Sequence, residues 1–179
     1  MSATGIDIQI AVPEDAAAIY HVQRQTWLAT YPNAAHGVTK QDIEAKFPLG
    51  ADAEEAIERK RILLRAQSAG AREWIAKDAG AVVGWAVGLI KQDKHELAAM
   101  YVLPDYQGKR VGGKLIAAAL EWLGDNHEVT LTVATYNRKA IEFYKRWGFR
   151  SLGPDPETDS ILPSGAGIPS LKMIRPAAK

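Results

Sequence analysis

The feature that most constrains this chain is a strand, a glycine-rich turn, a helix and a second strand that follow one another in the second half of the sequence. The hydrophobic pattern predicts strands over residues 96–103 and 129–134, and a helix over residues 110–123. Two strands joined by such a helical crossover lie parallel in one sheet, with a right-handed connection. The chain is therefore expected to contain a parallel strand pair within an α/β fold.

The rest of the chain predicts antiparallel strands and covering helices. A hairpin turns at Asp78-Ala79-Gly80, and a helix opens at Pro13. Residues 153–169 are rich in proline, glycine, serine and aspartate, which predicts a loop. Further strands are predicted over residues 6–10, 74–77, 82–90, 149–152 and, at a sheet edge, 170–174, and further helices over residues 39–47, 53–67 and 137–147. We expect a single domain over residues 1–179, with a mixed sheet and helices on its faces.

The composition excludes several classes of protein. The chain has 179 residues, 47% of them hydrophobic and 24% charged, which is typical of a globular protein. A formal net charge of +1 gives no reason to expect nucleic-acid binding or a polybasic membrane anchor. The longest apolar run, residues 81–90, is about half of the roughly 20 residues that a membrane span needs. Together with the absence of a signal-peptide pattern, these features predict a cytoplasmic protein without a membrane or nucleic-acid partner.

The residue types also restrict the chemistry. The chain has no cysteine, which excludes disulfides, thiolate metal sites and a cysteine nucleophile. Its four histidines have no metal-ligand spacing, so we expect no bound metal.

The glycine-rich turn, residues 107–114, has the composition of a phosphate-binding element. Free N–H groups at the start of a helix attract anions, and glycine lets a phosphate approach the backbone closely. Lys109, Arg110 and Lys114 add positive charge. The alternative is a surface turn in which the glycines only tighten the bend.

The same turn nearly matches the Walker A pattern of nucleotide triphosphatases. Gly108, Gly113 and Lys114 have the required spacing, but Leu115 follows instead of the serine or threonine that would hold Mg²⁺. No dinucleotide-binding G-x-G-x-x-G motif follows a strand either. A diphosphate ligand bound without metal fits the turn better.

A second motif identifies the ligand by resemblance. The pattern Asn137-x-x-Ala140-Ile141-x-Phe143-Tyr144-x-x-x-Gly148-Phe149, together with residues 96–113 and 131–133, closely resembles the GNAT superfamily of N-acetyltransferases. The resemblance covers about half of the chain. It implies a mostly antiparallel central sheet in which one parallel strand pair splays apart, with helices on both faces. The family's pyrophosphate motif falls on Gln107, Arg110 and Gly112, and Arg110 departs from the usual glycine.

The resemblance also implies where acetyl-CoA, the co-substrate, would bind. It would lie between the splayed strands, pairing with the backbone of residues 100–102, while Asn137 would hydrogen-bond the pantetheine arm. The predicted cofactor contacts are Met100, Tyr101, Val102, Gln107, Gly108, Lys109, Arg110, Val111, Gly112, Gly113, Lys114, Asn137, Ala140 and Tyr144.

Two residues are the candidates for proton transfer. Tyr144 matches the tyrosine that often serves the family as general acid; the alternative is an aromatic residue that only packs. Glu96 resembles the glutamate that is the base in some members; the alternatives are a solvated strand-end carboxylate and catalysis through ordered water. Period-two alternation predicts that Glu96 shares a strand face with Met100 and Val102. The resemblance also implies that the first helices and their loop cover the acceptor site, so Trp27 and Tyr31 are predicted to contact the acceptor, with ordinary helix packing as the alternative.

These expectations define an acetyl-CoA-dependent N-acetyltransferase. The acetyl group would pass to a primary amine, in a small molecule, by direct attack in a ternary complex. A CoA-binding sensor or interaction module without catalytic activity is the alternative. The sequence leaves open the identity of the acceptor amine, the acyl-chain preference and the oligomeric state, for which a homodimer is one of the options.

Overall fold

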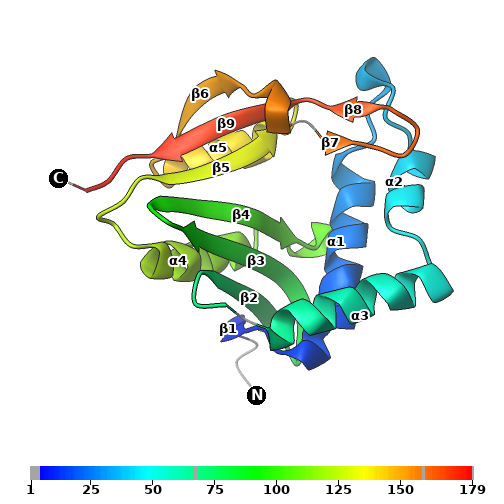
Figure 1. Cartoon of the computed structure of the whole chain (residues 1–179), viewed down its shortest axis with the longest axis horizontal. Helices are drawn as coiled ribbons and strands as arrows, with labels where there is room; N and C mark the ends of the chain where they lie inside the picture. Colours follow the sequence, from blue (N-terminus) through cyan, green and yellow to red (C-terminus); the bar gives the residue numbers. More distant parts are fainter. Residues whose placement is uncertain (1–4, 67, 159, 179) are drawn as a thin grey trace.

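The central element of the fold is a seven-stranded sheet, seen in a computed structural model that describes residues 5–66, 68–158 and 160–178. The strand order is β1-β2-β3-β4-β5-β9-β6 (Figure 1). The strands are β1 (Asp7–Ile10), β2 (Ala71–Asp78), β3 (Ala81–Lys91), β4 (Lys94–Val102), β5 (Val129–Ala134), β6 (Arg150–Pro154) and β9 (Ser170–Arg175). Neighbours pair antiparallel except β4 and β5, which are parallel. The mixed, mostly antiparallel sheet predicted from the sequence is therefore confirmed.

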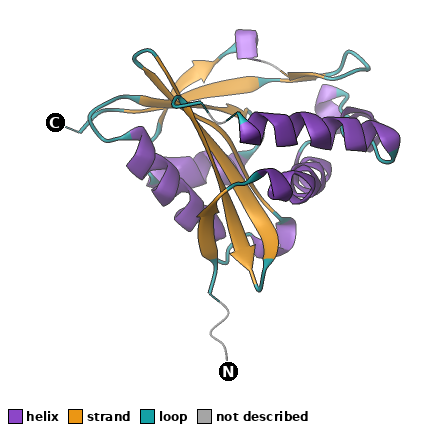
Figure 2. Cartoon of the chain, turned by 60° about the horizontal axis from the view of Figure 1, so that its bottom comes forward, coloured by secondary structure: helices purple, strands orange, loops and turns teal. Residues whose placement is uncertain are grey.

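Helices cover both faces of this sheet, as Figure 2 shows. They are α1 (Ala16–Thr30), α2 (Lys40–Lys46), α3 (Ala51–Arg65), α4 (Val111–Leu123) and α5 (Arg138–Arg146). Strand alternation divides the core into two layers: Trp85 packs with α1, α2 and α3, whereas its neighbour Ala86 packs with α4 and α5. Among the described residues, no helix is both long enough and apolar enough to cross a membrane.

Helix α4 is anchored by an apolar stripe against the sheet. Leu115, Ile116, Ala119 and Leu123 recur at helical spacing and are at most 1% exposed. Burying a leucine or isoleucine side chain contributes about 1.5–3 kcal/mol. This packing fixes the start of α4 beside the end of β4.

Strands β4 and β5 pair only at their beginnings and then diverge. The register contains two pairs, His95 with Val129 and Glu96 with Thr130. Beyond them β4 stays paired with β3 and β5 with β9, which leaves the gap between β4 and β5 that is visible in Figure 1. The register of β3 with β4 shifts at Ala98, which is an extra residue in β4. Such a bulge bends and twists its strand, which accounts for the turn of β4 away from β5.

The bulge also changes the direction of Glu96. Beyond Ala98, Met100 and Val102 pack with the α4 layer, and so does Leu97 before it. Glu96 precedes Leu97 by one residue and therefore points to the opposite face, toward the α1 layer. The prediction that Glu96 shares a face with Met100 and Val102 is wrong, because simple alternation does not allow for an inserted residue.

Two expectations about the end of the chain also need correction. The segment from Ser170 to Arg175 is not a sheet edge: β9 lies between β5 and β6, and β6 is the edge strand. The predicted loop 153–169 contains a small hairpin, β7 (Ser160–Ile161) and β8 (Gly167–Ile168). Ile168 is buried in the α1 layer, so the hairpin is attached to the core by an apolar anchor.

Candidate active site

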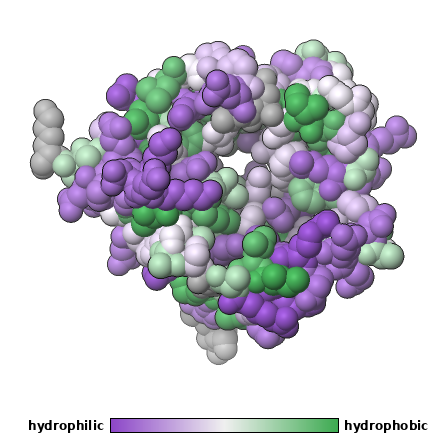
Figure 3. All heavy atoms as spheres, viewed as in Figure 1, coloured by the Kyte–Doolittle hydropathy of each residue, from purple (hydrophilic) through white to green (hydrophobic). Residues whose placement is uncertain are grey.

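A cleft of about 1010 Å³ lies where β4 and β5 diverge. Met100, Val102 and Tyr144 line it from the α4 layer, and Tyr31 and Tyr101 line it from the α1 layer. Figure 3 shows the surface hollowed between the two halves of the molecule. The cleft therefore passes through the sheet and has two chemically different sides.

On the α4 side, the edge of β4 offers unpaired backbone groups. The amide of Leu103 donates to the carbonyl of Val83 at 3.0 Å, and the continuous register makes Tyr101 and Trp85 the next hydrogen-bonded pair. The amide and carbonyl of Met100 and the amide of Val102 consequently point away from β3, into the gap, without a partner strand. Unpaired groups on a strand edge bind extended ligands that carry amides.

This geometry modifies the predicted contact at Tyr101. Its peptide groups pair with β3, so it reaches the cleft with its side chain, whereas Met100 offers its amide and carbonyl and Val102 its amide. The carbonyl of Val102 accepts hydrogen bonds from Gln107 Nε2 at 3.2 Å and from Thr26 Oγ1 at 3.4 Å. These two bonds hold the end of β4 in place.

The glycine-rich turn brings the start of α4 to the cleft. Gly108 has φ 80° and Arg110 has φ 65°, so both lie in the left-handed region. That conformation costs a residue with a Cβ about 1–2 kcal/mol, which explains why glycine is usual at the position of Arg110. A Cβ on Gly112 would stand 3.5 Å from the Phe143 ring. The protein itself thus has room for a Cβ there, and we attribute the glycine to a ligand that approaches the free amides of the first turn.

Three of the predicted phosphate contacts do not line the cleft. Lys109 Nζ lies 5.0 Å above the ring of Tyr106, and Lys114 Nζ donates to the carbonyl of Ile6 at 2.6 Å. Val111 is buried in the core. The predicted residues that do line the turn side are Gln107, Gly108, Arg110, Gly112 and Gly113.

Helix α5 supplies the basic residues that sequence reasoning missed. Arg138, Lys139 and Arg146 line the cleft together with Arg110. The signal was present, because all three belong to the helix that carries the second motif. The positive charge comes from this helix and Arg110, and not from the two lysines of the turn.

Asn137 has a structural role in addition to its predicted one. Its Oδ1 accepts a hydrogen bond from the amide of Ala140 at 3.2 Å and so caps α5. The cap leaves the Nδ2 amide group of Asn137 available, and the residue lines the cleft. Ala140 and Tyr144, one helical turn apart, line it as well.

Tyr144 stands between the two sides of the cleft. It is buried and makes edge-to-face contacts with Phe143 and Phe149, at ring-centroid distances of 5.5 and 5.9 Å. Burial raises the pKa of Tyr144 far above its ordinary value, with a further increase from Tyr101. Its hydroxyl therefore stays protonated at neutral pH and is held as a hydrogen-bond donor.

The α1 side of the cleft is a group of tyrosines. Burial, followed by the influence of Tyr101, Tyr144 and Tyr136, raises the pKa of Tyr31 well above its ordinary value. The Tyr136 hydroxyl donates to the Tyr31 carbonyl at 2.9 Å, which satisfies the end of α1. Tyr101 stacks on Trp85 with 5.8 Å between ring centroids. Tyr136 was not predicted, although it directly precedes the second motif.

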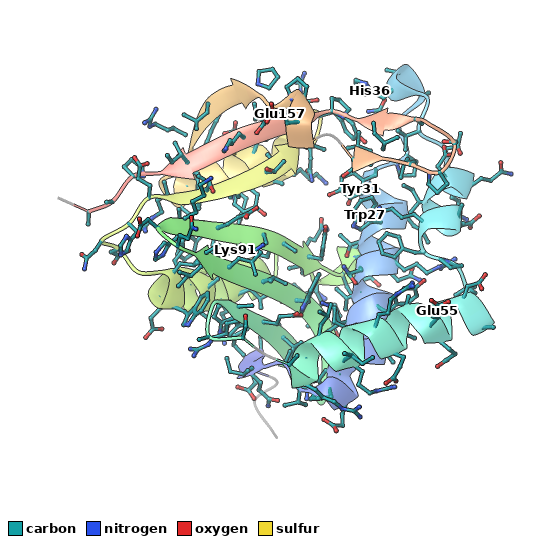
Figure 4. The ribbon with its side chains drawn as sticks, viewed as in Figure 1. Trp27, Tyr31, His36, Glu55, Lys91 and Glu157 are labelled. Carbon is teal, nitrogen blue, oxygen red and sulfur yellow. The ribbon has the colours of Figure 1, made fainter. Side chains whose placement is uncertain are left out.

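Trp27 supports this group from behind. Its ring centroid lies 4.4 Å from that of Tyr31, and Figure 4 shows both side chains at the end of α1. Trp27 is 7% exposed and does not line the cleft. Tyr31 thus lines the cleft, whereas Trp27 packs behind it, and a contact of either with the acceptor stays a prediction.

Glu96 lies at the closed end of the gap. It is half-buried, pairs in register with Leu89 and Thr130, and does not line the cleft. It faces the α1 layer, the side of the tyrosines. A role as base would require a relay such as water, and it stays a prediction.

Known proteins share both the sequence motifs and the fold. The model of the Acetyltransferase (GNAT) family matches residues 19–149. A segment of 77 residues is 36% identical to the spore coat polysaccharide biosynthesis protein SpsD of Bacillus subtilis; it covers 42% of this chain and 27% of that protein. The chain thus matches about a quarter of that relative's length.

Two solved structures agree with the architecture over nearly the whole chain. The PaiA N-acetyltransferase of Thermoplasma acidophilum, solved in complex with coenzyme A, gives a TM-score of 0.73 at 21% identity, covering 96% of this chain and 99% of that one. A GNAT-family acetyltransferase from Streptococcus pneumoniae gives 0.72 at 21% identity, with the same coverage. The family match and the shared fold lead to one conclusion: this chain belongs to the GNAT family of acetyltransferases.

Proposed function

We propose that the protein transfers the acetyl group of acetyl-CoA to a primary amine of a small molecule, by direct attack in a ternary complex. The observation that carries the proposal is the cleft through the sheet, with unpaired backbone groups on its α4 side and neutral tyrosines on its α1 side. Such a cleft allows donor and acceptor to enter from opposite faces and to meet between β4 and β5.

The residues of the α4 side fit coenzyme A. The free amides at the start of α4, together with Arg110, would hold its pyrophosphate. Arg138, Lys139 and Arg146 supply further charge for its phosphates. The amide and carbonyl of Met100 and the amide of Val102 would pair with the pantetheine arm, and Asn137 Nδ2 would donate to the same arm.

The reaction needs a neutral amine and a stabilised leaving group. The amine nitrogen attacks the thioester carbonyl carbon, a C–N bond forms, the C–S bond breaks, and the sulfur leaves as a thiolate. The amide of Met100 or Val102 would donate to the carbonyl oxygen as negative charge develops, and one such donor contributes about 3 kcal/mol. Tyr144, protonated and buried, would donate to the thiolate. The proton that the amine loses would pass to water, with Glu96 as the candidate base.

The sequence supports direct transfer over a covalent acyl-enzyme. The chain contains no cysteine that could accept the acetyl group from the thioester. Initial-velocity measurements with varied acetyl-CoA and varied amine test this point. Intersecting lines in double-reciprocal plots support a ternary complex, and parallel lines would contradict it.

The activity itself is tested by thiol release from acetyl-CoA with a mixed panel of amines. We expect release above the rate of uncatalysed hydrolysis with at least one amine. Tight binding of acetyl-CoA without release for any amine would contradict the proposal and favour a non-catalytic CoA-binding module.

A further inference from the structure

We infer that the acceptor carries a single amine and no second positive charge, its remainder being uncharged. This inference rests on the proposed function, because it concerns the acceptor of that reaction. It excludes polyamines and other polycations as good substrates.

The charges that line the cleft carry this inference. No aspartate or glutamate lines it among the described residues, whereas four basic residues do: Arg110, Arg138, Lys139 and Arg146. All four belong to the start of α4 or to α5, the side proposed for the cofactor phosphates. The α1 side is formed by neutral side chains, including Thr26, Thr30 and the tyrosines.

Glu96, the candidate base for the reacting amine, lies at the closed end of the gap without lining the cleft, and two further carboxylates of this side are engaged elsewhere. Glu73 lies behind Trp85, whose Nε1 donates to it at 2.7 Å, and Lys60 Nζ is 3.1 Å from the same carboxylate. Asp42 accepts hydrogen bonds from the amide and the hydroxyl of Thr39, at 2.7 and 2.6 Å, and so belongs to the cap of α2. Neither carboxylate lines the cleft to balance an ammonium group.

The tyrosines do not provide a counter-charge either. Burial raises the pKa of Tyr31, Tyr101 and Tyr144, so their hydroxyls remain neutral at physiological pH. A neutral phenol is suited to hydrogen-bond an amine, a hydroxyl or a carbonyl, but it leaves a cation without a partner.

Attraction of a cation to the aromatic rings does not reverse this conclusion. A cation–π contact contributes about 0.5–2 kcal/mol, whereas removing an ion from water costs several kcal/mol. One face of the Tyr101 ring is already covered by Trp85, and Tyr136 stacks on His36 at 5.1 Å. The desolvation cost of a second ammonium group therefore outweighs the attraction that these rings can offer.

The test compares matched amines that differ in one charge. Thiol release is measured for pentylamine against cadaverine, and for methylbenzylamine against xylylenediamine, within a panel that also contains aminopentanol, tyramine and spermidine. In each matched pair of which the protein acetylates at least one member, we expect kcat/KM for the diamine to be at least about tenfold lower than for the monoamine. The reason is that the second ammonium of the diamine is desolvated without a partner. A diamine or spermidine whose kcat/KM equals or exceeds that of the matched monoamines would overturn the inference. Thiol release with none of the amines counts against the proposed transferase function itself.

A variant sharpens the same test. Ala29 is exposed, lies in the last turn of α1 and lines the cleft, so a longer side chain fits without disturbing the core. Ala29→Glu introduces a carboxylate on the acceptor side, and Ala29→Gln is the control with the same shape and no charge. We expect the ratio of diamine to monoamine activity to rise at least about fivefold in Ala29→Glu relative to Ala29→Gln, since the new carboxylate balances the second ammonium. Equal ratios in the two variants would count against the inference.

Discussion

The two sides of the gap between β4 and β5 are built differently, and we propose that they recognise their ligands by different means. On the α4 side the main contributors are backbone groups: the edge of β4 at Met100 and Val102, and the free amides at the start of α4. On the α1 side they are side chains, above all those of Tyr31, Tyr101 and Tyr136. Backbone recognition depends on a local conformation that a short motif encodes. Side-chain recognition depends on which distant residues the fold brings together, and it leaves no compact motif.

The largest effect on CoA affinity is expected from a negative charge placed on the α4 side of the cleft. Gly112→Asp puts a carboxylate where the cofactor phosphates are proposed to bind, and juxtaposed like charges cost several kcal/mol, so CoA affinity should fall by about 100-fold or more. Isothermal titration calorimetry measures this loss. Gly112→Asn keeps the steric conflict of a side chain with the ligand but adds no charge, so it should lose less, and the difference between the two variants measures the effect of the charge. Unchanged CoA binding by Gly112→Asp would show that this turn does not hold the phosphates.

A smaller but still large effect is expected where the two sides meet. Tyr144→Phe removes the proposed donor to the thiolate and should lower kcat by about 100-fold while changing CoA affinity by less than about threefold. Tyr106→Phe is the matched control, because its hydroxyl donates to Asp78 Oδ2 at 3.1 Å and it does not line the cleft. Equal losses of kcat and of CoA affinity in Tyr144→Phe would indicate a packing role.

The pH dependence gives a second test of Tyr144. Burial holds the pKa of its hydroxyl far above the ordinary value of about 10, so the hydroxyl stays protonated as the pH rises through that value. The kcat of the wild-type protein should therefore show no descending limb near pH 10. A descending limb near pH 10 that the wild-type protein shows and Tyr144→Phe lacks would contradict this assignment.

Substitution of Glu96, which faces the α1 side, should have an intermediate effect on kcat/KM. Glu96→Gln should lower kcat/KM by about tenfold at neutral pH, less than for a base in direct contact, because Glu96 does not line the cleft. An amine with a pKa near about 10 becomes neutral without help at high pH, so the deficit should shrink as the pH approaches that value. A deficit that is constant with pH would exclude Glu96 as the base.

The smallest effect is expected at Arg110, which stands where the family usually has a glycine. Arg110→Gly relieves the left-handed conformation, a gain of about 1–2 kcal/mol, against an entropic cost of about 0.5–1 kcal/mol for glycine. The free energy of unfolding should therefore rise by up to about 1.5 kcal/mol, as chemical denaturation measures, whereas Arg110→Ala should show no such gain. Both variants lose the same charge and should bind CoA with equally reduced affinity. Stabilisation in both variants, or in neither, would contradict the strain at this position.

The same difference between the two sides explains which parts of the fold and of the site the sequence predicts. The strand order around the crossover, the turn at residues 107–114 and the helix of Asn137 follow from local patterns, and the sheet bears them out. The bulge at Ala98 and the place of β9 between β5 and β6 do not, because they depend on contacts between distant strands. Trp27 and Tyr31 were predicted as acceptor contacts only from the family resemblance, because no local motif marks them. Tyr136 directly precedes a recognised motif, and Arg138 and Lys139 occupy its variable positions, yet all three were missed.

The central claim is that the gap between β4 and β5 is the cofactor groove, and amide hydrogen exchange by NMR tests it most directly. Without ligand, the amides of Met100 and Val102 point into the gap and should exchange quickly, whereas the amide of Tyr101 is paired with β3 and should be protected. Saturating CoA should slow exchange at Met100 and Val102 by at least about tenfold and leave Tyr101 nearly unchanged. CoA that binds while exchange at Met100 and Val102 stays fast would contradict the account.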